Sequence, residues 1–374
     1  MGIPAFALER YFARWEFVAP YLLCSSDLET MGMGELLAMA DVETRSLWEN
    51  LTLGYTEYAG HPLLRAEIAR LYSSVTLDDV YTFAGAEEAI YVFMRAVLNA
   101  GDHLIAFAPG YQSLYEVARS AGADVTVIPL TMQNGWRVDP EAVRLAVTPA
   151  TRLIMVNAPH NPTGTLPDAA TFGAITRVAR DAGAYLFCDE VYRFSEYAPE
   201  SRLPTAADVY ERGVSLGVLS KSFGLAGLRT GWLATRDRHA LHRVAAYKDY
   251  TTICNNAPGE ILSIIALRSR ERIVERNLSI VRANLVLLDA FFERHAGTFD
   301  WVRPQAGGIG FPRLRRDAPI DEFVKELVHE QGVLLLPGSV YDDAPSAFAA
   351  GNHFRIGFGR SNFPEALARL ERFL

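Results

Sequence analysis

The amine of Lys221 stands out because lysine is rare in this sequence. The chain has 36 Lys and Arg residues together, and only three of them are lysines: Lys221, Lys248 and Lys325. Lys221 lies in a segment rich in Gly and Ser (220–232), and Arg229 follows it by eight positions. Such a lysine can be a plain loop residue, but a primary amine can also form a Schiff base, which arginine cannot. We expect Lys248 and Lys325, which lie in mixed-charge helical stretches, to be solvated.

Four short apolar runs are each followed by residues that could do chemistry. The runs, which predict buried strands, cover 80–83, 153–156, 185–188 and 214–219. After them come Gly85-Ala86-Glu87, the segment 157–164, Asp189-Glu190-Val191-Tyr192 and Ser220-Lys221. Each group alone is typical of a turn or a helix cap. Because ligands bind beyond the carboxyl ends of parallel strands, we expect these groups to converge at one edge of a sheet.

The order of the predicted elements indicates an α/β fold. Apolar runs at 103–107, 124–128 and 232–234 alternate with helical segments at 88–99, 112–121, 168–182 and 237–249. We therefore predict a large domain with a mostly parallel central sheet flanked by helices. Helical patterns at 6–17, 30–41 and 63–72 precede this domain, and a stretch at 258–295, as two helices or one kinked helix, follows it.

The C-terminal part predicts a second, smaller domain of the α+β type. Its predicted strands cover 308–312, 333–337 and 354–358, and a helix at 364–373 closes the chain. We expect residues 1–45 to pack with this small domain, residues 46–275 to form the large domain that binds the cofactor, and residues 276–374 to form the small domain.

The composition indicates a folded protein and argues against broad nucleic-acid binding. The 374 residues have a formal net charge of −8, 50% of them are hydrophobic, and no basic run occurs. Cys24, Cys188 and Cys254 lie far apart without metal-ligand spacing, so we expect free thiols and no metal site. The absence of a signal core or a membrane-length apolar run leads us to expect a cytoplasmic protein without a membrane partner.

The groups at the strand ends resemble those of a known family. The sequence is similar to fold-type I pyridoxal-phosphate enzymes of the class I/II aminotransferase family. The motifs that carry the resemblance are Asn161-Pro162-Thr163-Gly164, Asp189-Glu190-Val191-Tyr192, Ser220-Lys221, Gly227-Leu228-Arg229-Thr230-Gly231 and Phe354-Arg355-Ile356. The resemblance implies an aspartate aminotransferase-like fold and pyridoxal 5'-phosphate as cofactor.

The resemblance also implies roles around the cofactor ring. Lys221 matches the lysine that forms a Schiff base with the cofactor aldehyde and, once freed, moves the Cα proton. Asp189 matches the carboxylate under the pyridine nitrogen, which keeps that nitrogen protonated. Asn161 and Tyr192 match two donors to the ring oxygen, and Tyr111 matches the aromatic residue that stacks on the ring. Lys221, Asp189 and Tyr192 are thus the expected catalytic residues.

The phosphate is expected at the start of the predicted helix that follows the first strand. Backbone N–H groups of Gly85, Ala86 and Glu87 would face it there, and Arg229 matches the phosphate-binding arginine. Many relatives carry a hydroxyl residue three positions before the lysine, where this chain has Val218. Ser220 or Ser222 could supply the missing donor.

We expect both the substrate and a second subunit to contact the cofactor site. Arg355 matches the arginine that binds the substrate α-carboxylate, together with Asn161. Tyr55, with Tyr58 as the competing candidate, matches a tyrosine that relatives donate to a neighbouring subunit's cofactor, which implies a homodimer. In the N-terminal segment, Ser25 and the carboxylates of Glu9, Asp27 and Glu29 are candidates for contact with the substrate side chain. The alternative for these carboxylates is helix capping at a solvated surface.

Three functions remain open at this point. The first is a pyridoxal-phosphate enzyme acting at Cα of an L-amino acid, most simply an aminotransferase that passes the amino group to a 2-oxo acid. The second is a lyase or cyclase on a guanidino amino acid. The stretches 159–164, 248–252, 307–313 and 355–358 resemble those of capreomycidine synthase-like cyclases, which act on hydroxylated arginine. The third, a regulator built on this fold, is disfavoured because only a few dozen residues precede the predicted α/β domain.

Overall fold

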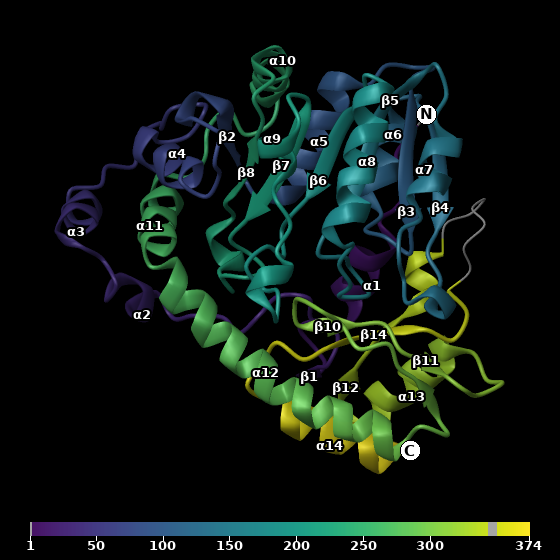
Figure 1. The fold of residues 1–374 in the computed structure, drawn as a ribbon. Coiled ribbons are helices and arrows are strands. Elements are labelled where there is room, and N and C mark those ends of the chain that lie inside the picture. Colours follow the sequence, from purple (N-terminus) through teal and green to yellow (C-terminus); the bar gives the residue numbers. More distant parts are fainter. Residues whose placement is uncertain (1, 343–349) are drawn as a thin grey trace.

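A seven-stranded sheet forms the centre of the computed structural model, which describes residues 2–342 and 350–374 (Figure 1). Within these residues, the strand order is β2 (Val80–Phe83), β8 (Gly231–Ala234), β7 (Gly213–Val218), β6 (Tyr185–Asp189), β5 (Thr151–Asn157), β3 (His103–Ala108) and β4 (Asp124–Pro129). Strands β3 to β7 pair in parallel, whereas β8 runs antiparallel to both β7 and β2. The predicted α/β class with a mostly parallel sheet is confirmed.

Helices cover both faces of this sheet because successive side chains of its strands point to opposite sides. In β3, Leu104 and Ala106 pack on one face, and Ile105 and Phe107 pack on the other. The first face carries α5 (Ala86–Val97), α6 (Ser113–Ser120) and α10 (Arg238–Lys248). The second carries α7 (Pro140–Ala146), α8 (Ala169–Asp181) and α9 (Ala206–Val209).

A third apolar cluster lies at the β2 and β8 end of the sheet. There Val80, Trp232 and Ala234 pack with α4 (Pro62–Ala69) and α11 (Ala257–Arg268). Helices α2 (Met33–Leu37) and α3 (Val42–Glu49) lie against α11 at this end of the molecule. The helix predicted at 30–41 is shorter than expected, because Gly32 and Gly34 weaken it and because the Asp41 side chain caps a new helix, α3, by accepting from the Thr44 N–H.

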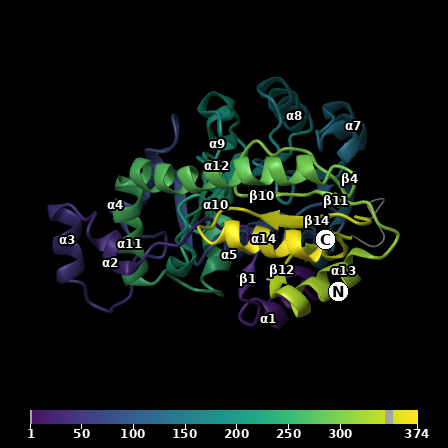
Figure 2. The same cartoon turned by 90° about the horizontal axis from the view of Figure 1, so that it is seen from below.

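The long helix α12 (Arg270–Arg294) follows α11 directly and reaches the smaller C-terminal unit. Figure 2 shows α12 beside α14 (Phe363–Phe373) in this unit. The smaller unit also contains helix α13 (Ile320–Gln331). Its short strands are β9 (Phe299–Asp300), β10 (Ile309–Gly310), β11 (Arg313–Leu314), β12 (Val333–Leu334), β13 (Leu336–Pro337) and β14 (Phe354–Gly357). These elements enclose their own apolar core.

The N-terminal segment crosses from one unit to the other. Helix α1 (Ala7–Trp15) packs between the two, and β1 (Tyr21–Leu22) pairs in parallel with β12 of the smaller unit. The segment 23–28 adds Leu23 and Leu28 to the smaller unit's core. Short 3-10 turns occur at Leu77–Asp79, Met132–Asn134, Pro199–Ser201, Ala226–Leu228 and Gly338–Tyr341. Among the described helices, none is long and apolar enough to cross a bilayer.

The expectation that Lys248 is solvated is wrong. The side chain is only 1% exposed, and its Nζ donates to the carbonyl oxygens of Tyr58 (2.9 Å) and Ile253 (3.0 Å). These two bonds join the end of α10 to the loop that precedes α4 and to the turn that follows α10, so Lys248 has a structural role. Lys325 is exposed as expected.

Candidate active site

A cavity of about 340 Å³ opens at the carboxyl edge of the central sheet. It brings together most of the residues expected from the sequence, namely Ala86, Glu87, Tyr111, Asn161, Asp189, Tyr192, Ser220, Lys221, Arg229, Arg355, Glu9, Ser25 and Asp27. Further lining comes from Leu8, Phe12, Glu16, Ser26, Ile90, Val191, Val218 and Ala226. The convergence follows from the topology, because β5, β6 and β7 are neighbours that end at the same edge.

Lys221 follows β7 and extends its amine into this cavity. Its Nζ donates to the Ser26 hydroxyl over 2.8 Å. Burial lowers the pKa of Lys221 from its ordinary value, the charge of Asp27 opposes that shift, and Arg355 adds to it. An amine with a lowered pKa is more often neutral, and only a neutral amine can act as a nucleophile or a base.

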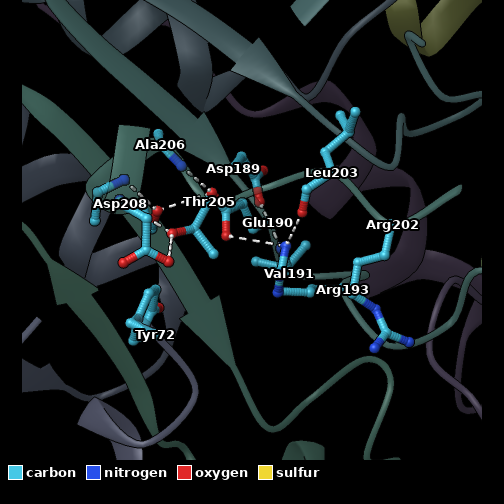
Figure 3. Close-up of polar contacts among 12 residues, drawn as sticks. Tyr72, Asp189, Glu190, Val191, Arg193, Arg202, Leu203, Thr205, Ala206 and Asp208 are labelled. Carbon is cyan, nitrogen blue, oxygen red and sulfur yellow. Dashed lines mark hydrogen bonds and ion pairs between the residues drawn. The ribbon is translucent and has the colours of Figure 1, made fainter. Parts of the chain in front are cut away.

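The neighbouring acids Asp189 and Glu190 have different surroundings. Asp189 ends β6 and lines the cavity, whereas Glu190 points toward α9 on the far side (Figure 3). There the Glu190 Oε1 atom accepts from the N–H of Ala206 (2.9 Å) and from the Ser215 hydroxyl (2.8 Å). Glu190 therefore anchors the start of α9, and Asp189 is the carboxyl available for chemistry.

Burial raises the pKa of Asp189 to about 7, opposed by the backbone N–H of Val191 and by the charge of Lys221. The Val191 N–H donates to Oδ1 of Asp189 over 3.2 Å and fixes the carboxyl. A buried carboxyl with this pKa gains most from a cationic N–H partner, because such a partner favours the charged form.

Asn161 and Tyr192 both offer hydrogen-bond donors to the cavity. Asn157 fixes the loop, since its Oδ1 accepts from the Asn161 N–H (2.7 Å) and its side-chain amide donates to the Asp189 carbonyl (3.0 Å). The hydroxyl of Tyr192 is buried and has no hydrogen-bond partner of ordinary geometry among the described residues. A buried, unsatisfied hydroxyl in a cavity wall indicates a ligand atom that accepts from it.

Arg355 in β14 is a buried cation, 1% exposed, without an ion-pair partner among the described residues. Its Nε donates to the Cys24 carbonyl (2.9 Å), and its Nη1 donates to the Tyr341 hydroxyl (3.0 Å) and to Oδ1 of Asn161 (3.3 Å). All three acceptors are neutral. A buried guanidinium held only by neutral acceptors suits a carboxylate ligand that forms the missing pair.

The part of the cavity lined by Ala86, Glu87 and Arg229 has the features of an anion site. The first turn of α5 points its free N–H groups here, and the Arg229 guanidinium lies beside Gly85. Val218 lines the cavity with apolar atoms, so it supplies no donor. Ser220 lines the cavity, whereas the Ser222 hydroxyl is buried outside the lining, which leaves Ser220 as the nearer candidate. The side chain of Glu87 accepts from Ser113 (3.0 Å), and burial raises its pKa to about 7.

Carboxylates from the N-terminal segment form another wall of the cavity, but Glu29 is not among them, since it lies outside the lining and accepts from the Ser361 N–H (2.6 Å). Glu9 in α1 accepts from the Tyr111 hydroxyl over 3.4 Å. Asp27 is already paired, since Nη2 of Arg360 donates to both of its carboxylate oxygens over 2.9 Å. Glu16 also lines the wall, and burial raises its pKa, with further increases from the charges of Asp27 and Glu9.

Tyr55 lies outside this cavity. Its side chain is 90% exposed and that of Tyr58 is 65% exposed. Neither lines the cavity of its own chain, so a contact with the site would need a second copy of the chain.

Sequence reasoning did not single out Glu16, Ser26 or Tyr341. Glu16 is the residue directly after α1 and follows Glu9 by seven positions, a spacing that predicts the same side of a helix and could have pointed to it. Ser26 adjoins the expected Ser25, but only the fold shows which hydroxyl reaches Lys221. Tyr341 carried no sequence signal.

Comparison with known proteins agrees with the architecture of this site. Residues 21–370 match the family described as Aminotransferase class I and II. The chain is 28% identical to capreomycidine synthase of Streptomyces vinaceus, over 96% of this chain and 90% of the relative. It is also 28% identical to an arginine–pyruvate transaminase of Pseudomonas aeruginosa, over 86% of this chain and 83% of the relative.

Among solved structures, a PLP-dependent aminotransferase from Streptococcus suis superimposes with a TM-score of 0.92 at 29% identity, covering 100% of this chain and 98% of the other. The family match spans almost the whole chain, including every strand that positions the cavity. The chain therefore belongs to the aminotransferase class I and II family, and it is a pyridoxal-phosphate-dependent enzyme of the aminotransferase type.

Proposed function

We propose that this enzyme transfers the amino group of an L-amino acid with a cationic side chain to a 2-oxo acid. The observation that carries the substrate class is the acidic wall of a cavity that also contains Arg355. In this wall Asp27 is already paired with Arg360, whereas Glu9 and Glu16 form no ion pair among the described residues. A guanidinium or ammonium group on the substrate would be attracted to that wall, while Arg355 would bind the α-carboxylate.

The residues of the cavity fit pyridoxal phosphate. The unsatisfied Tyr192 hydroxyl and the Asn161 amide would donate to the ring oxygen, Asp189 would accept from the ring nitrogen, and Tyr111 would cover the ring face. Arg229, Ser220 and the first turn of α5 would hold the phosphate. When bound through Lys221, the cofactor supplies an electron sink that stabilises negative charge at the substrate Cα.

The chain's own groups would then divide the work. Asp189 would hold the proton on the ring nitrogen, because a carboxylate at hydrogen-bond distance favours the charged form of its partner. The Nζ of Lys221 would move the proton to and from Cα. Arg355 and Asn161 would fix the α-carboxylate so that Cα faces Lys221.

A second reaction is favoured by the same acidic wall and by the likeness to capreomycidine synthase over 96% of the chain. In it, the enzyme would cyclise a hydroxylated arginine without any acceptor. The two reactions share the cofactor and Lys221 and differ in whether nitrogen leaves the substrate.

An assay with matched substrates tests both candidates. The holoenzyme is incubated with L-arginine, L-ornithine, L-norvaline and hydroxylated arginine, each with and without pyruvate. Amino transfer predicts alanine formation that is faster with L-arginine than with uncharged L-norvaline, and Glu16→Gln should reduce this preference. A cyclised product without pyruvate supports the second reaction, and equal rates with arginine and norvaline contradict the cationic substrate class.

We further propose a cytoplasmic homodimer in which Tyr55 reaches the partner's cofactor phosphate. Support comes from the exposure of Tyr55 and of its neighbours Leu53 (85%) and Tyr58 (65%), since exposed apolar side chains gathered on one loop are typical of an interface. The cysteines among the described residues are free thiols, which suits a reducing compartment.

A further inference from the structure

Ser26 and Lys221 are 195 positions apart in the sequence, yet their side chains are in contact. The Nζ of Lys221 donates to Oγ of Ser26 over 2.8 Å. Ser26 comes from the segment between β1 and α2, whereas Lys221 comes from the loop after β7. The contact therefore joins the N-terminal segment to the residue that holds the cofactor.

The smaller unit fixes the position of Ser26 from both sides. Before it, the Leu23 carbonyl accepts from the Gly357 N–H (3.0 Å) and the Cys24 carbonyl accepts from Nε of Arg355 (2.9 Å). After it, Asp27 is held by two hydrogen bonds from Arg360. A Cβ atom at Gly357 would lie 2.2 Å from the Ser25 carbonyl oxygen, so the segment packs directly on β14. These contacts fix the backbone on both sides of Ser26 and so fix the position of its hydroxyl relative to Lys221.

Among the described residues, Ser26 is the hydrogen-bond partner of the amine. The charged groups that face Lys221 are Asp27, Arg355, Asp189, Glu9 and Glu16, and among the described residues none forms an ion pair with its Nζ within 4.0 Å. The Tyr192 ring centroid lies 5.9 Å from Nζ. The Ser26 hydroxyl is close enough to the Tyr192 phenol to oppose the rise of its pKa, although the two do not form a hydrogen bond of ordinary geometry.

A neutral amine has two N–H donors and one lone pair, and it works as a base only when the lone pair points at the proton to be removed. A hydrogen bond from one N–H to a fixed acceptor restricts rotation about the last bond of the lysine side chain. A hydroxyl is suited to this task because it accepts without adding charge to the cavity.

We propose that Ser26 is a positioning residue: it holds the amine of Lys221 whenever that amine is not joined to the cofactor and directs its lone pair toward the substrate Cα. This inference rests on the proposed role of Lys221 as the group that moves the Cα proton. It goes beyond that role in assigning the orientation of the amine to a residue from the N-terminal segment.

The first test follows cofactor capture by the apo-protein and needs no substrate. The rate at which Lys221 captures pyridoxal phosphate is measured by absorbance across pH, because only the neutral amine reacts. Ser26 accepts from the charged amine and so stabilises it, hence Ser26→Ala should move the midpoint of the profile to lower pH. Ser26→Thr, which keeps the hydroxyl, should restore it. Ser279→Ala, at an exposed position of α12, controls for effects of a Ser-to-Ala substitution that are unrelated to Lys221.

The second test measures the orientation of the amine. Exchange of the α-proton of L-arginine with deuterated water is followed by NMR in the holoenzyme, with L-alanine as a second probe. Ser26→Ala should slow this exchange about tenfold, the effect of one lost hydrogen bond to a reacting group, and Ser26→Thr should recover most of it.

The combination separates positioning from general damage. Faster capture at neutral pH together with slower exchange supports the proposal, whereas damage to the fold would slow both and lower the thermal midpoint. An unmoved capture profile with unchanged exchange overturns it. If the wild type exchanges neither probe, the role of Lys221 on these substrates fails, while the capture profile still decides whether Ser26 controls the amine.

Discussion

A Cβ atom added at Gly85 would lie 2.7 Å from Nη2 of Arg229, closer than real side chains pack. Gly85 also has φ +94°, a conformation that L side chains rarely adopt. The absence of a side chain at Gly85 is thus what lets the guanidinium lie against the start of α5. Two sources of positive potential, the guanidinium and the helix N-terminus, meet at this point.

Gly85→Ala should therefore raise the Kd for pyridoxal phosphate by about tenfold or more, because the arginine must move and the backbone is strained. Gly101→Ala is the matched control. Gly101 has φ +85° but open space around it, so Gly101→Ala introduces the backbone strain without a steric conflict. Titration of both apo-proteins with the cofactor should show weakened binding only for Gly85→Ala. Equal Kd values for the two variants would contradict the assignment of Arg229 to the phosphate site.

Arg355→Ala should raise KM for the amino acid at least thirtyfold, roughly the loss of one partner of a buried charge pair, with cofactor affinity almost unchanged. Arg355→Lys keeps the charge but not the two-pronged geometry, and it should fall between the wild type and the alanine variant. Steady-state kinetics beside a cofactor titration separate the two effects. An unchanged KM for Arg355→Ala would show that the α-carboxylate binds elsewhere.

The contribution of Asp189 to the stability of the apo-protein should decrease as pH rises from about 4 to about 7. Burial raises the pKa of Asp189 to about 7 in the folded chain, while an unfolded aspartate titrates near 4. Between these values the Asp189 carboxyl binds a proton in the folded state but not in the unfolded state, so its contribution to stability falls with rising pH. Glu87 and Glu260, whose pKa values burial also raises to about 7, act in the same direction. Burial lowers the pKa of His160 to about 4, so this residue acts in the opposite direction.

Asp189→Asn removes the contribution of Asp189, so the Tm of the variant relative to that of the wild type should rise between about pH 4 and about pH 7 in thermal denaturation of the apo-protein. The same substitution should strongly reduce turnover of the holoenzyme, because the neutral amide no longer holds the proton on the ring nitrogen. An identical Tm slope in the variant would mean that Asp189 is already ionised in the folded chain.

Sharing of Tyr55 between subunits can be tested with mixed dimers. Tyr55→Phe alone should weaken cofactor binding, whereas a purified heterodimer of Tyr55→Phe and Lys221→Ala chains should regain one site of wild-type affinity. In that site Lys221 comes from one chain and Tyr55 from the other. Tyr58→Phe in the same format tests the competing tyrosine. A heterodimer that binds no better than the Tyr55→Phe homodimer would place Tyr55 outside the partner's site.

The sequence predicted the parts of the site that depend on local order. Asp189 and Lys221 follow apolar strands directly, and neighbouring parallel strands must end together, so their convergence could be inferred before the fold was known. The roles of Arg355 and Tyr192 required the family resemblance. Contacts across long sequence distances could not be predicted: Ser26 reaches Lys221 only because β14 and Arg360 clamp its backbone.

Lys248 shows the same limit. Its helix has a mixed-charge pattern typical of a solvated face, but the carbonyls of Tyr58 and Ile253 converge on its Nζ and make burial possible. The positions of the two loops that contain Tyr58 and Ile253 cannot be predicted from the sequence of α10. Burial of a charged side chain depends on its partners, and these are known only from the assembled structure.

Identifying the lysine that binds the cofactor covalently is the most direct test of the proposed active site. The protein is incubated with pyridoxal phosphate, reduced with borohydride and digested, and the modified peptide is identified by mass spectrometry. The expected result is a yellow protein with one phosphopyridoxyl group per chain, on Lys221, and no fixed label in Lys221→Ala. A protein that stays colourless, or a label on Lys248 or Lys325, would contradict the assignment of this cavity as the catalytic site.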